Sequence, residues 1–552
     1  MHIPKYNIAW IFVDGVRRYH ATDDRGRIKF MDKFAKESIE FLNVVTSAPS
    51  TYMSLGSMLS GLPSYYISRN FDDFRYESGS FPNLTSDLKQ VGYNVYSFLD
   101  HKDTRETMLN WLPMIPREYW LKGLTHEHWW TPKEINQVLN NVLSSSIDTP
   151  AFFFVGHDCR GNMNISDDTE WVYSIFKKYG YTEDNTIFIL CSDHGYPDQS
   201  KETGRPEYYK DRNLSHDLIL TDDNIMIPFF IKYPGCEKGR KIHTTVSSID
   251  LYSTVMDLLN LKVESKSMLN SKSWLPLINN DESYIAMMEK RFHRCDSRFF
   301  FQDWKGTVIR NGKYKYINYH GAKYGGGDPE EFFDIMNDPF ENNNLIFTKE
   351  QSIIENLYEF QKEFNESENN AFAYQVEYLA SKLIKSKGVV IKKSNNILLI
   401  DSGNPLFLKM LIEMIKNINL RINISLLRVE HDFDYKDINI IESHYKSWNV
   451  EIIKDRNIIE KIRLLFPDII IIPFNTSEGR DNKFLKKFIN RLPANEKIYL
   501  DYNLGYYKRT LLNYYWKKFK PMWHFVKHEP LYIVNFIYSN LIKYISKKRE
   551  IG

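Results

Sequence analysis

Two aspartates, a histidine and a threonine stand at the ends of three separate apolar runs. The runs are residues 7–14, 43–51 and 185–195, and the side chains are Asp14, Thr51, Asp193 and His194. Parallel strands deliver the residues at their carboxyl ends to one edge of a sheet, so we expect these groups to meet there. Carboxylate and imidazole ligands suit a divalent cation, which lowers the pKa of a neighbouring hydroxyl. The pattern predicts metal-dependent cleavage or transfer of a phosphorus or sulfur ester.

Short apolar strands alternate with helical patterns in residues 1–264, which is typical of a doubly wound α/β domain that would form the catalytic core. We expect its strands at 7–13, 93–99, 151–156, 186–191 and 227–232. We expect its helices at 29–39, 83–91, 132–145, 168–179 and 250–261.

A smaller α+β region follows at 265–385. An Asn-Gly pair separates two β-rich runs in 307–319, which is a strong hairpin signal. Helical patterns at 349–364 and 369–386 close this region. The basic, polar stretch 385–396 predicts a break and a domain boundary.

A second α/β unit is expected at 395–505. It opens with a strand, a Gly-Asn-Pro turn and a helix. Its further strands are expected at 422–429, 449–455, 468–475 and 496–503. This pattern predicts a Rossmann-like module, but it contains no GxGxxG or other phosphate-binding loop, so the sequence predicts no ligand for it.

Charge and cysteine content narrow the classes of function. The 552-residue chain has a formal net charge of +2, so no overall field favours nucleic acid. Its four cysteines lack disulfide or zinc spacing, which favours a reducing compartment. The first apolar run is too short for a secretory signal, and no run reaches the ~20 apolar residues of a membrane span. We therefore expect a cytoplasmic enzyme.

The C-terminal tail, 506–552, has a composition of its own. It carries ten lysines and arginines against two glutamates, with Trp516 and Trp523 interleaved. A basic segment with interfacial aromatics could make a peripheral contact with an anionic membrane. A solvated helical pair packed on the preceding module is the alternative, and the sequence leaves both open.

Eight blocks within residues 1–350 resemble, in order, the sulfatase family of the alkaline phosphatase superfamily. They are 30–51, 54–64, 81–98, 149–157, 184–195, 222–235, 246–261 and 330–345. The resemblance implies an alkaline phosphatase-like mixed sheet. It also implies that Asp14, Asp193 and His194 are metal ligands, and that Thr51 is the nucleophile and is itself bound to the metal.

The chain departs from the sulfatase pattern around that nucleophile. Sulfatases use a formylglycine made from cysteine or serine, and threonine cannot be converted to it by the same oxidation. The motif's proline and arginine are replaced by Met53 and Leu55. Thr51 and the sequence from Asp14 to Arg17 are instead similar to a Thr-nucleophile branch of phosphodiesterases and of phosphoethanolamine and phosphoglycerol transferases. That similarity implies that Arg17 binds substrate.

Further site residues follow from the resemblance. His157 and Asp158 match the region of the family's active-site histidine, so we expect His157 to orient a substrate oxygen or act as a general acid and Asp158 to bind substrate. His216 and Lys102 lie near substrate-contacting positions, and we expect them in a catalytic and a substrate-binding role. Asn162 stands where the two-metal branch has a histidine, which implies one metal ion.

The identity of that ion stays open among manganese, magnesium, zinc and calcium. Gly15 replaces the second aspartate that sulfatases carry after the first strand, and this lowers the oxygen count and disfavours calcium.

Three functions compete at this point. The main hypothesis is an ester hydrolase or phosphotransferase that uses Thr51 and one divalent metal ion on a small-molecule, glycan-linked or lipid-linked ester. The alternative is a true sulfatase, which a formylglycine at Ser47 would favour. The third is a non-catalytic relative that binds a glycan or lipid head group. Retention of all four core residues argues against the third hypothesis.

Overall fold

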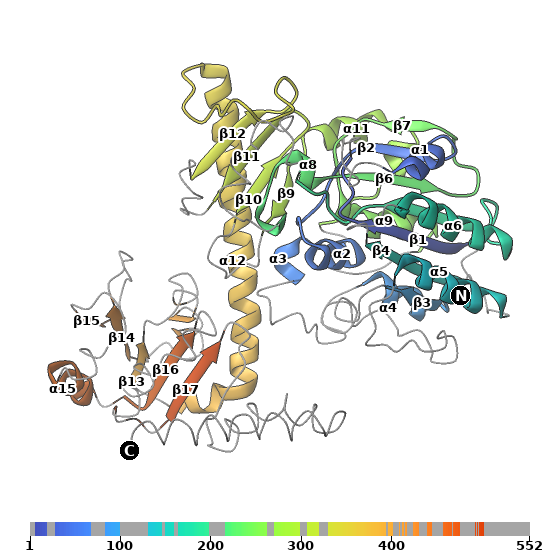
Figure 1. Cartoon of the computed structure of the whole chain (residues 1–552). Coiled ribbons are helices and arrows are strands. Elements are labelled where there is room, and N and C mark those ends of the chain that lie inside the picture. The colour runs from blue at the N-terminus through green and yellow to red at the C-terminus, as the bar shows by residue number, and fades with distance from the viewer. Residues whose placement is uncertain are drawn as a thin grey trace, which may run out of the picture. The chain divides into compact units, whose positions relative to one another are not determined.

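The computed structural model describes most of the first 393 residues and parts of the rest. The described residues are 6–18, 28–67, 83–99, 131–145, 150–158, 164–197, 216–261, 270–297, 306–319, 329–393, 396–400, 423–429, 439–443, 456–465, 467–474 and 496–501, with a few single residues between 408 and 494. The chain forms two compact units, an N-terminal unit of residues 1–381 and a C-terminal unit of residues 382–552 (Figure 1).

A mixed sheet forms the centre of the N-terminal unit, with eight strands among the described residues. From one edge to the other they are β3 (Asn94–Phe98), β4 (Ala151–Asp158), β1 (Asn7–Asp14), β5 (Thr186–Cys191), β6 (Met226–Lys232), β2 (Ile39–Val45) and β7 (Arg240–Ile242), with β8 (Val246–Ser247) also on β2. The pairs β3–β4, β4–β1 and β1–β5 are parallel, whereas β6 is antiparallel to both its neighbours. The expected strands and the expected mixed sheet are confirmed.

Helices cover both faces of this sheet, which explains why its strands are almost continuously apolar. Along β1, Trp10 and Phe12 point into one core and Ile11 and Val13 into the other. The first core is closed by α2 (Thr51–Ser60), α4 (Leu84–Gln90), α9 (Leu251–Leu258), α10 (Leu275–Ile278) and α11 (Glu282–Glu289). The second is closed by α1 (Lys29–Ala35), α5 (Pro132–Ser144) and α6 (Ile165–Lys178). The doubly wound arrangement is therefore confirmed.

A four-stranded antiparallel sheet completes the N-terminal unit. Its strands are β9 (His293–Asp296), β10 (Thr307–Arg310), β11 (Tyr314–Asn318) and β12 (Glu330–Asp334), in the order β12-β11-β10-β9. The predicted Asn-Gly hairpin joins β10 and β11. One face of the sheet packs on helix α12 (Gln351–Lys393), which lies beside it in Figure 1. The contact is made through Phe360 and Phe364 of that helix. The other face packs on Met226 at the start of β6.

Helix α12 corrects one expectation. It runs without interruption from Gln351 to Lys393, so the prediction of two separate helices was wrong. The two compact units meet within this helix, after Ser381, close to the predicted boundary at 385–396. The sequence of α12 contains no proline, and its one glycine, Gly388, costs only about 1 kcal/mol relative to alanine. A polar composition alone does not end a helix whose exposed face is solvated.

The C-terminal unit has a parallel sheet of the Rossmann-like type. Its strands are β13 (Asn396–Ile400), β14 (Asn423–Val429), β15 (Asn439–Ser443), β16 (Ile469–Phe474) and β17 (Glu496–Asp501), in the order β15-β14-β13-β16-β17. Helix α15 (Arg456–Leu465) precedes β16. β15 lies where no strand was expected, and the strand predicted at 449–455 falls outside the described residues.

Two further expectations from the sequence concern the C-terminal tail and membrane spans. The tail at 506–552 lies outside the described residues. Among the helices that the structure does describe, none is long and apolar enough to cross a membrane.

Candidate active site

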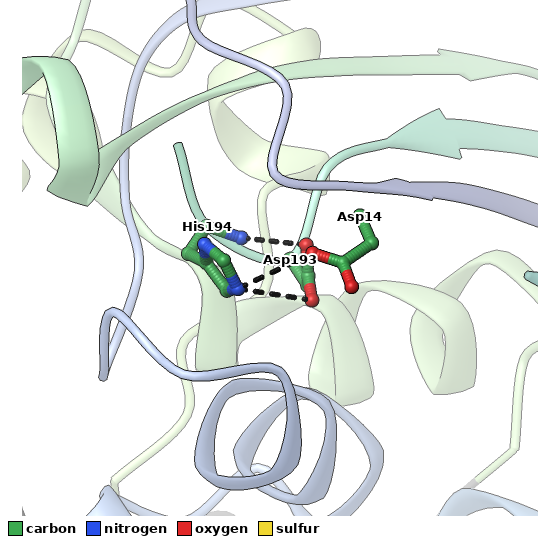
Figure 2. Close-up of side chains that lie close together, drawn as sticks. All are labelled: Asp14, Asp193 and His194. Carbon is green, nitrogen blue, oxygen red and sulfur yellow. Dashed lines mark hydrogen bonds and ion pairs between the residues drawn. The ribbon is translucent and has the colours of Figure 1, made fainter. Parts of the chain in front are cut away.

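The carboxyl ends of two parallel neighbours, β1 and β5, bring three potential ligands together. Asp14 is the last residue of β1, and Asp193 and His194 follow β5 directly (Figure 2). One ligand atom from each of the three side chains lies within 4.8 Å of the others. His194 Nε2 is 3.4 Å from Asp14 Oδ1 and 3.6 Å from Asp193 Oδ2. The structure thus gathers the predicted metal ligands.

Thr51 joins this cluster from a helix rather than from a strand end. It is the first residue of α2, and its Oγ1 lies 3.2 Å from His194 Nε2. The preceding strand, β2, is antiparallel to β6, and β6 is antiparallel to β5, so β2 runs in the same direction as β1 and β5. Its carboxyl end therefore leads to the same edge of the sheet, as expected, and Thr51 follows it at the start of α2. Ser50 is the N-cap residue of α2, which leaves the Thr51 hydroxyl available to the cluster.

The hydrogen bonds of His194 fix which ring nitrogen is a ligand. Nδ1 lies 2.5 Å from the carbonyl oxygen of Gly195, which can only accept, so Nδ1 carries the proton. The lone pair on Nε2 therefore faces Asp14 and Asp193. Burial, together with the positive charge of His216, lowers the pKa of His194 and favours this neutral ring.

An unpaired buried oxygen completes the donor set. Asp193 is fully buried, and its Oδ2 accepts no hydrogen bond from the residues that the structure describes. Burial raises the pKa of this carboxyl group to about 6, against the opposing effect of the amides of His194 and Gly15. Two carboxylates and a lone-pair nitrogen that converge without a bridging proton fit a divalent cation. Asp14, Asp193 and His194 are the residues that would hold it.

The two loops that carry the ligands are locked to one another. Gly15 and His194 donate their amide N–H groups to Asp193 Oδ1, at 3.2 and 2.9 Å. Gly15 has a φ of 73°, which favours glycine and turns its amide toward Asp193. Ser192 Oγ accepts the amide N–H of Val16 at 3.0 Å and lies 2.7 Å from the carbonyl oxygen of Val13. Gly15, which stands in place of a possible carboxylate ligand, thus helps to position the ligand Asp193.

His216 reaches the cluster from a short 3₁₀ helix, His216–Leu218. Its ring stacks on that of His194, with centroids 4.8 Å apart and an interplanar angle of 22°. Burial acts to lower the pKa of His216, but the hydrogen bond and charge of Asp217, with the charges of Asp14 and Asp193, raise it overall. The raised pKa favours the protonated form of the His216 ring, beside the His194 ring whose pKa is lowered.

The segment that carries His216 approaches the ligand loop very closely. Gly195 donates its amide N–H to the carbonyl of Asn224 at 2.8 Å, and a Cβ on Gly195 would lie 2.1 Å from the carbonyl oxygen of Asp223. The Asn224 amide group donates to the carbonyls of His216 and Ile219, at 2.8 and 2.6 Å. Asn224 thus ties the His216 turn to the ligand loop.

His157 lies apart from the cluster. It is buried on β4, and its Nε2 pairs with Asn136 Oδ1 of α5 at 3.0 Å. Burial lowers the pKa of His157 to about 3, so the ring is neutral. It packs between the sheet and α5, which is the arrangement of a structural histidine.

The other predicted substrate-binding residues are only partly described. Arg17 is buried in the loop after β1. Asp158 is the strand partner of Asp14 in the β1–β4 pairing, and its side chain is outside the described part of the residue. Lys102 lies outside the described residues altogether.

Sequence reasoning missed the hydroxyls that support Asp193. Thr46 Oγ1 and Ser54 Oγ lie 2.8 and 2.6 Å from its carbonyl oxygen. A signal was present, because Ser54, Ser57 and Ser60 recur every three residues in the otherwise apolar helix α2. Such spacing places small polar groups on one helix face.

Comparisons with known proteins agree with this fold. The family model described as N-sulphoglucosamine sulphohydrolase, C-terminal, matches residues 214–370. An ulvan-active sulfatase of Formosa agariphila is 25% identical over 215 residues, which are 33% of this chain and 38% of that protein. A second sulfatase of the same organism is 24% identical over 295 residues, 52% of this chain and 45% of the relative. The chain thus spans less than half the length of these two relatives.

A solved structure shows the same fold. It is that of yidJ, a candidate sulfatase of Bacteroides fragilis, with a TM-score of 0.50 and 16% identity over 67% of this chain and 96% of that chain. These relatives are sulfatases, and they lend no support to the expected Thr-nucleophile branch of phosphodiesterases and transferases. Residues 214–370 thus match a family model named for a sulphohydrolase, and the relatives with which the chain shares sequence are sulfatases.

Proposed function

We propose that this protein hydrolyses a sulfate ester, with Thr51 as the attacking hydroxyl and a divalent cation held by Asp14, Asp193 and His194. One observation carries the proposal: Thr51 Oγ1 lies 3.2 Å from His194 Nε2, inside a ligand cluster with an unpaired buried carboxylate oxygen. The sulfatase relatives supply the ester class. In this respect the true-sulfatase alternative is better supported than phosphotransfer.

Each group of the cluster has its own role in the proposed reaction. When bound, the cation supplies positive charge that stabilises the developing oxyanion and lowers the pKa of a neighbouring hydroxyl. Thr51 Oγ, after giving its proton to solvent, attacks the sulfur, the bond from sulfur to the alcohol oxygen breaks, and the alcohol oxygen takes a proton from the His216 imidazolium. Water then attacks the sulfur of the threonine sulfate and gives one proton to His216, which restores the imidazolium. The bond from sulfur to Thr51 Oγ breaks, hydrogen sulfate leaves, and Thr51 Oγ takes a proton from solvent.

A sulfated glycan is the substrate class that we propose. One relative is named as an ulvan-active sulfatase and another as an endo-4-O-sulfatase. A sugar hydroxyl is a poor leaving group, so protonation by His216 would matter more for a glycan than for an aryl ester.

A phosphate ester is the second candidate, because threonine cannot become formylglycine. Ser47, the other residue considered for that modification, is buried, and its hydroxyl has no hydrogen-bond partner in the described structure. A threonine hydroxyl beside a cation is suited to phosphoryl as well as sulfuryl transfer.

Turnover of matched substrates separates these candidates. The full chain, reconstituted with manganese, magnesium, calcium or zinc, is given an aryl sulfate, a phosphate monoester and a phosphodiester with the same leaving group. We expect the sulfate to be cleaved fastest, and Asp193→Asn to abolish that cleavage. Faster phosphodiester cleavage would favour the second candidate, and mass spectrometry showing formylglycine at Ser47 would move the nucleophile. No turnover of any ester with any of the metals would contradict the proposal.

The tail supports a separate proposal about location. We propose that residues 506–552, with ten basic residues, make a peripheral contact with an anionic membrane on the cytoplasmic side. Sedimentation with anionic vesicles should retain the full chain and lose a variant that ends at residue 505. Equal sedimentation of both would contradict this contact.

A further inference from the structure

Two buried hydroxyl groups contact the backbone carbonyl of Asp193, one of the proposed metal ligands. Thr46 Oγ1 lies 2.8 Å and Ser54 Oγ 2.6 Å from the carbonyl oxygen of Asp193, and the two hydroxyl oxygens are 2.8 Å apart. All three residues are fully buried. We propose that Thr46 and Ser54 form a hydroxyl clamp that fixes the position of Asp193 relative to Thr51, and so tunes both metal binding and attack.

The two halves of the clamp come from different elements. Thr46 follows β2, and its amide N–H donates to the carbonyl of Ile225 at 2.9 Å, which anchors it to the end of the short helix α8 (Asp222–Ile225), just before β6. Ser54 lies one turn beyond Thr51 on α2, and residues three apart on a helix share a face. The first turn of α2 therefore offers one hydroxyl to the His194 ring and another to the Asp193 backbone.

The clamp joins α2 to the ligand loop through the backbone carbonyl oxygen of Asp193. The carboxyl group of Asp193 is held from the opposite side, where Gly15 donates to Oδ1 at 3.2 Å. Loss of the clamp would leave the loop attached to β1, and would leave it in contact with α2 only through the Thr51 hydroxyl and the His194 ring among the contacts described above. The separation of Thr51 from the ligand cluster would then no longer be fixed. Thr46 and Ser54 are in this sense positioning residues.

Helix α2 contains a matched control for this role. Ser57 lies three residues after Ser54 and is equally buried, but its hydroxyl has no hydrogen-bond partner in the described structure. Removal of this hydroxyl tests what a buried serine on α2 contributes to packing alone. Thr46→Val and Thr46→Ser form a second pair, because valine keeps the shape of threonine and serine keeps its hydroxyl.

The first measurement is the affinity of the full-length protein for Mn²⁺ alone, by isothermal titration calorimetry. We expect Ser54→Ala and Thr46→Val to weaken Mn²⁺ binding about tenfold or more, as is usual when a group that orients a ligand is lost. Ser57→Ala and Thr46→Ser should stay within about twofold of the wild type, since each leaves a clamp hydroxyl at both positions. The melting temperature of each metal-free variant checks its folding, and the Thr46 pair decides the matter if Ser54→Ala does not fold.

The second measurement is a double-mutant cycle on ester turnover, and this part rests on the proposed function. If the clamp acts through Thr51, Ser54→Ala should lower kcat more than it raises KM, and it should cause no further loss in a Thr51→Ala background. Unchanged Mn²⁺ affinity in both Ser54→Ala and Thr46→Val would overturn the clamp. Wild-type protein that binds Mn²⁺ but cleaves no ester would remove the proposed function while the calorimetric test of the clamp stands.

Discussion

The Thr51 hydroxyl and the His194 ring come from opposite sides of the active site and meet at 3.2 Å, although 143 residues separate them in the chain. The contact is specific because the Nδ1 of His194 is committed to the carbonyl of Gly195, so that Nε2 is the nitrogen that faces Thr51. A hydroxyl group thus lies next to a neutral imidazole and two carboxylates.

Asp193 should cost the metal-free protein stability. The pKa of its carboxyl group is raised by burial from the ordinary 3.8 to about 6, so the unfolded chain ionises first as the pH rises. Folding stability therefore falls between pH 4 and pH 6 by roughly 3 kcal/mol and stays lower above that range. Asp193→Asn keeps the acceptor for Gly15 and His194 and removes the charge. In urea unfolding at pH 7, the metal-free variant should be more stable than the wild type and should gain nothing from Mn²⁺.

Two results would argue against this account of Asp193. A less stable Asp193→Asn variant would mean that its carboxylate is already compensated without a cation. Stabilisation of the variant by Mn²⁺ equal to that of the wild type would mean that Asp193 is not a ligand.

His157 should make the fold sensitive to acid without affecting catalysis. Its pKa is about 3 in the folded protein, whereas the unfolded chain takes up the proton near pH 6.5. The unfolded state is therefore favoured as the pH falls below 6.5, by roughly 2 to 3 kcal/mol at pH 4.5. His157→Gln should lose less stability than the wild type between pH 7 and pH 4.5, with kcat retained. Loss of turnover in a folded His157→Gln variant would restore the catalytic role that the sequence suggested.

The elements around the site were largely predictable, and their side-chain contacts were not. Asp14 and Asp193 could be placed together because each follows a strand that is apolar throughout, and such strands are parallel and adjacent in doubly wound sheets. Thr51 lies beyond the end of β2 and opens a helix, so the apolar run indicated the edge of the sheet and the family register indicated the residue. His157 faces α5, and the sequence pattern could not show this, because one residue along a strand reverses the face and the pattern does not say which of His157 and Asp158 points to α5.

The supporting contacts lie beyond any sequence pattern. Ser54 and Asn224 act by donating to backbone carbonyls, which every residue possesses, so the identity of the acceptor carries no signal. The continuity of helix α12 was missed for a different reason. Helix propensity distinguishes helix from loop only weakly, and a polar stretch without proline is compatible with either.

Asn224 should be needed for the placement of His216. Its side-chain amide donates to two carbonyls, and Asn224→Asp would set a carboxylate against both of them. We expect a loss of roughly 2–4 kcal/mol in stability together with a drop in kcat. Asn136→Asp is the control, since Asn136 is also buried. Its side-chain amide donates to the carbonyl of Asp168, and its Oδ1 pairs with His157. The control should lose stability with kinetic constants unchanged, and an equal drop in kcat in both variants would refute the specific role.

A buried ion cluster should stabilise the attachment of the antiparallel sheet. Lys315 Nζ contacts Asp222 Oδ1 at 3.0 Å and Glu341 Oε1 at 2.7 Å, and Lys315 is fully buried. Lys315→Met would leave Glu341 without its cation and should cost roughly 3–5 kcal/mol in urea unfolding. Lys33→Met breaks an exposed pair with Glu170 and should cost only about 0–1 kcal/mol. Similar losses in the two variants would show that burial does not govern this pair.

The nucleophile decides the central claim. The most direct test is turnover of an aryl sulfate by wild type and Thr51→Ala, both saturated with Mn²⁺ and both shown by calorimetry to bind it. The account predicts that Thr51→Ala loses about 10³-fold or more in kcat while its Mn²⁺ affinity changes less than about tenfold. Sulfate cleavage that survives at the wild-type rate in Thr51→Ala would contradict it, because another group would then be making the attack.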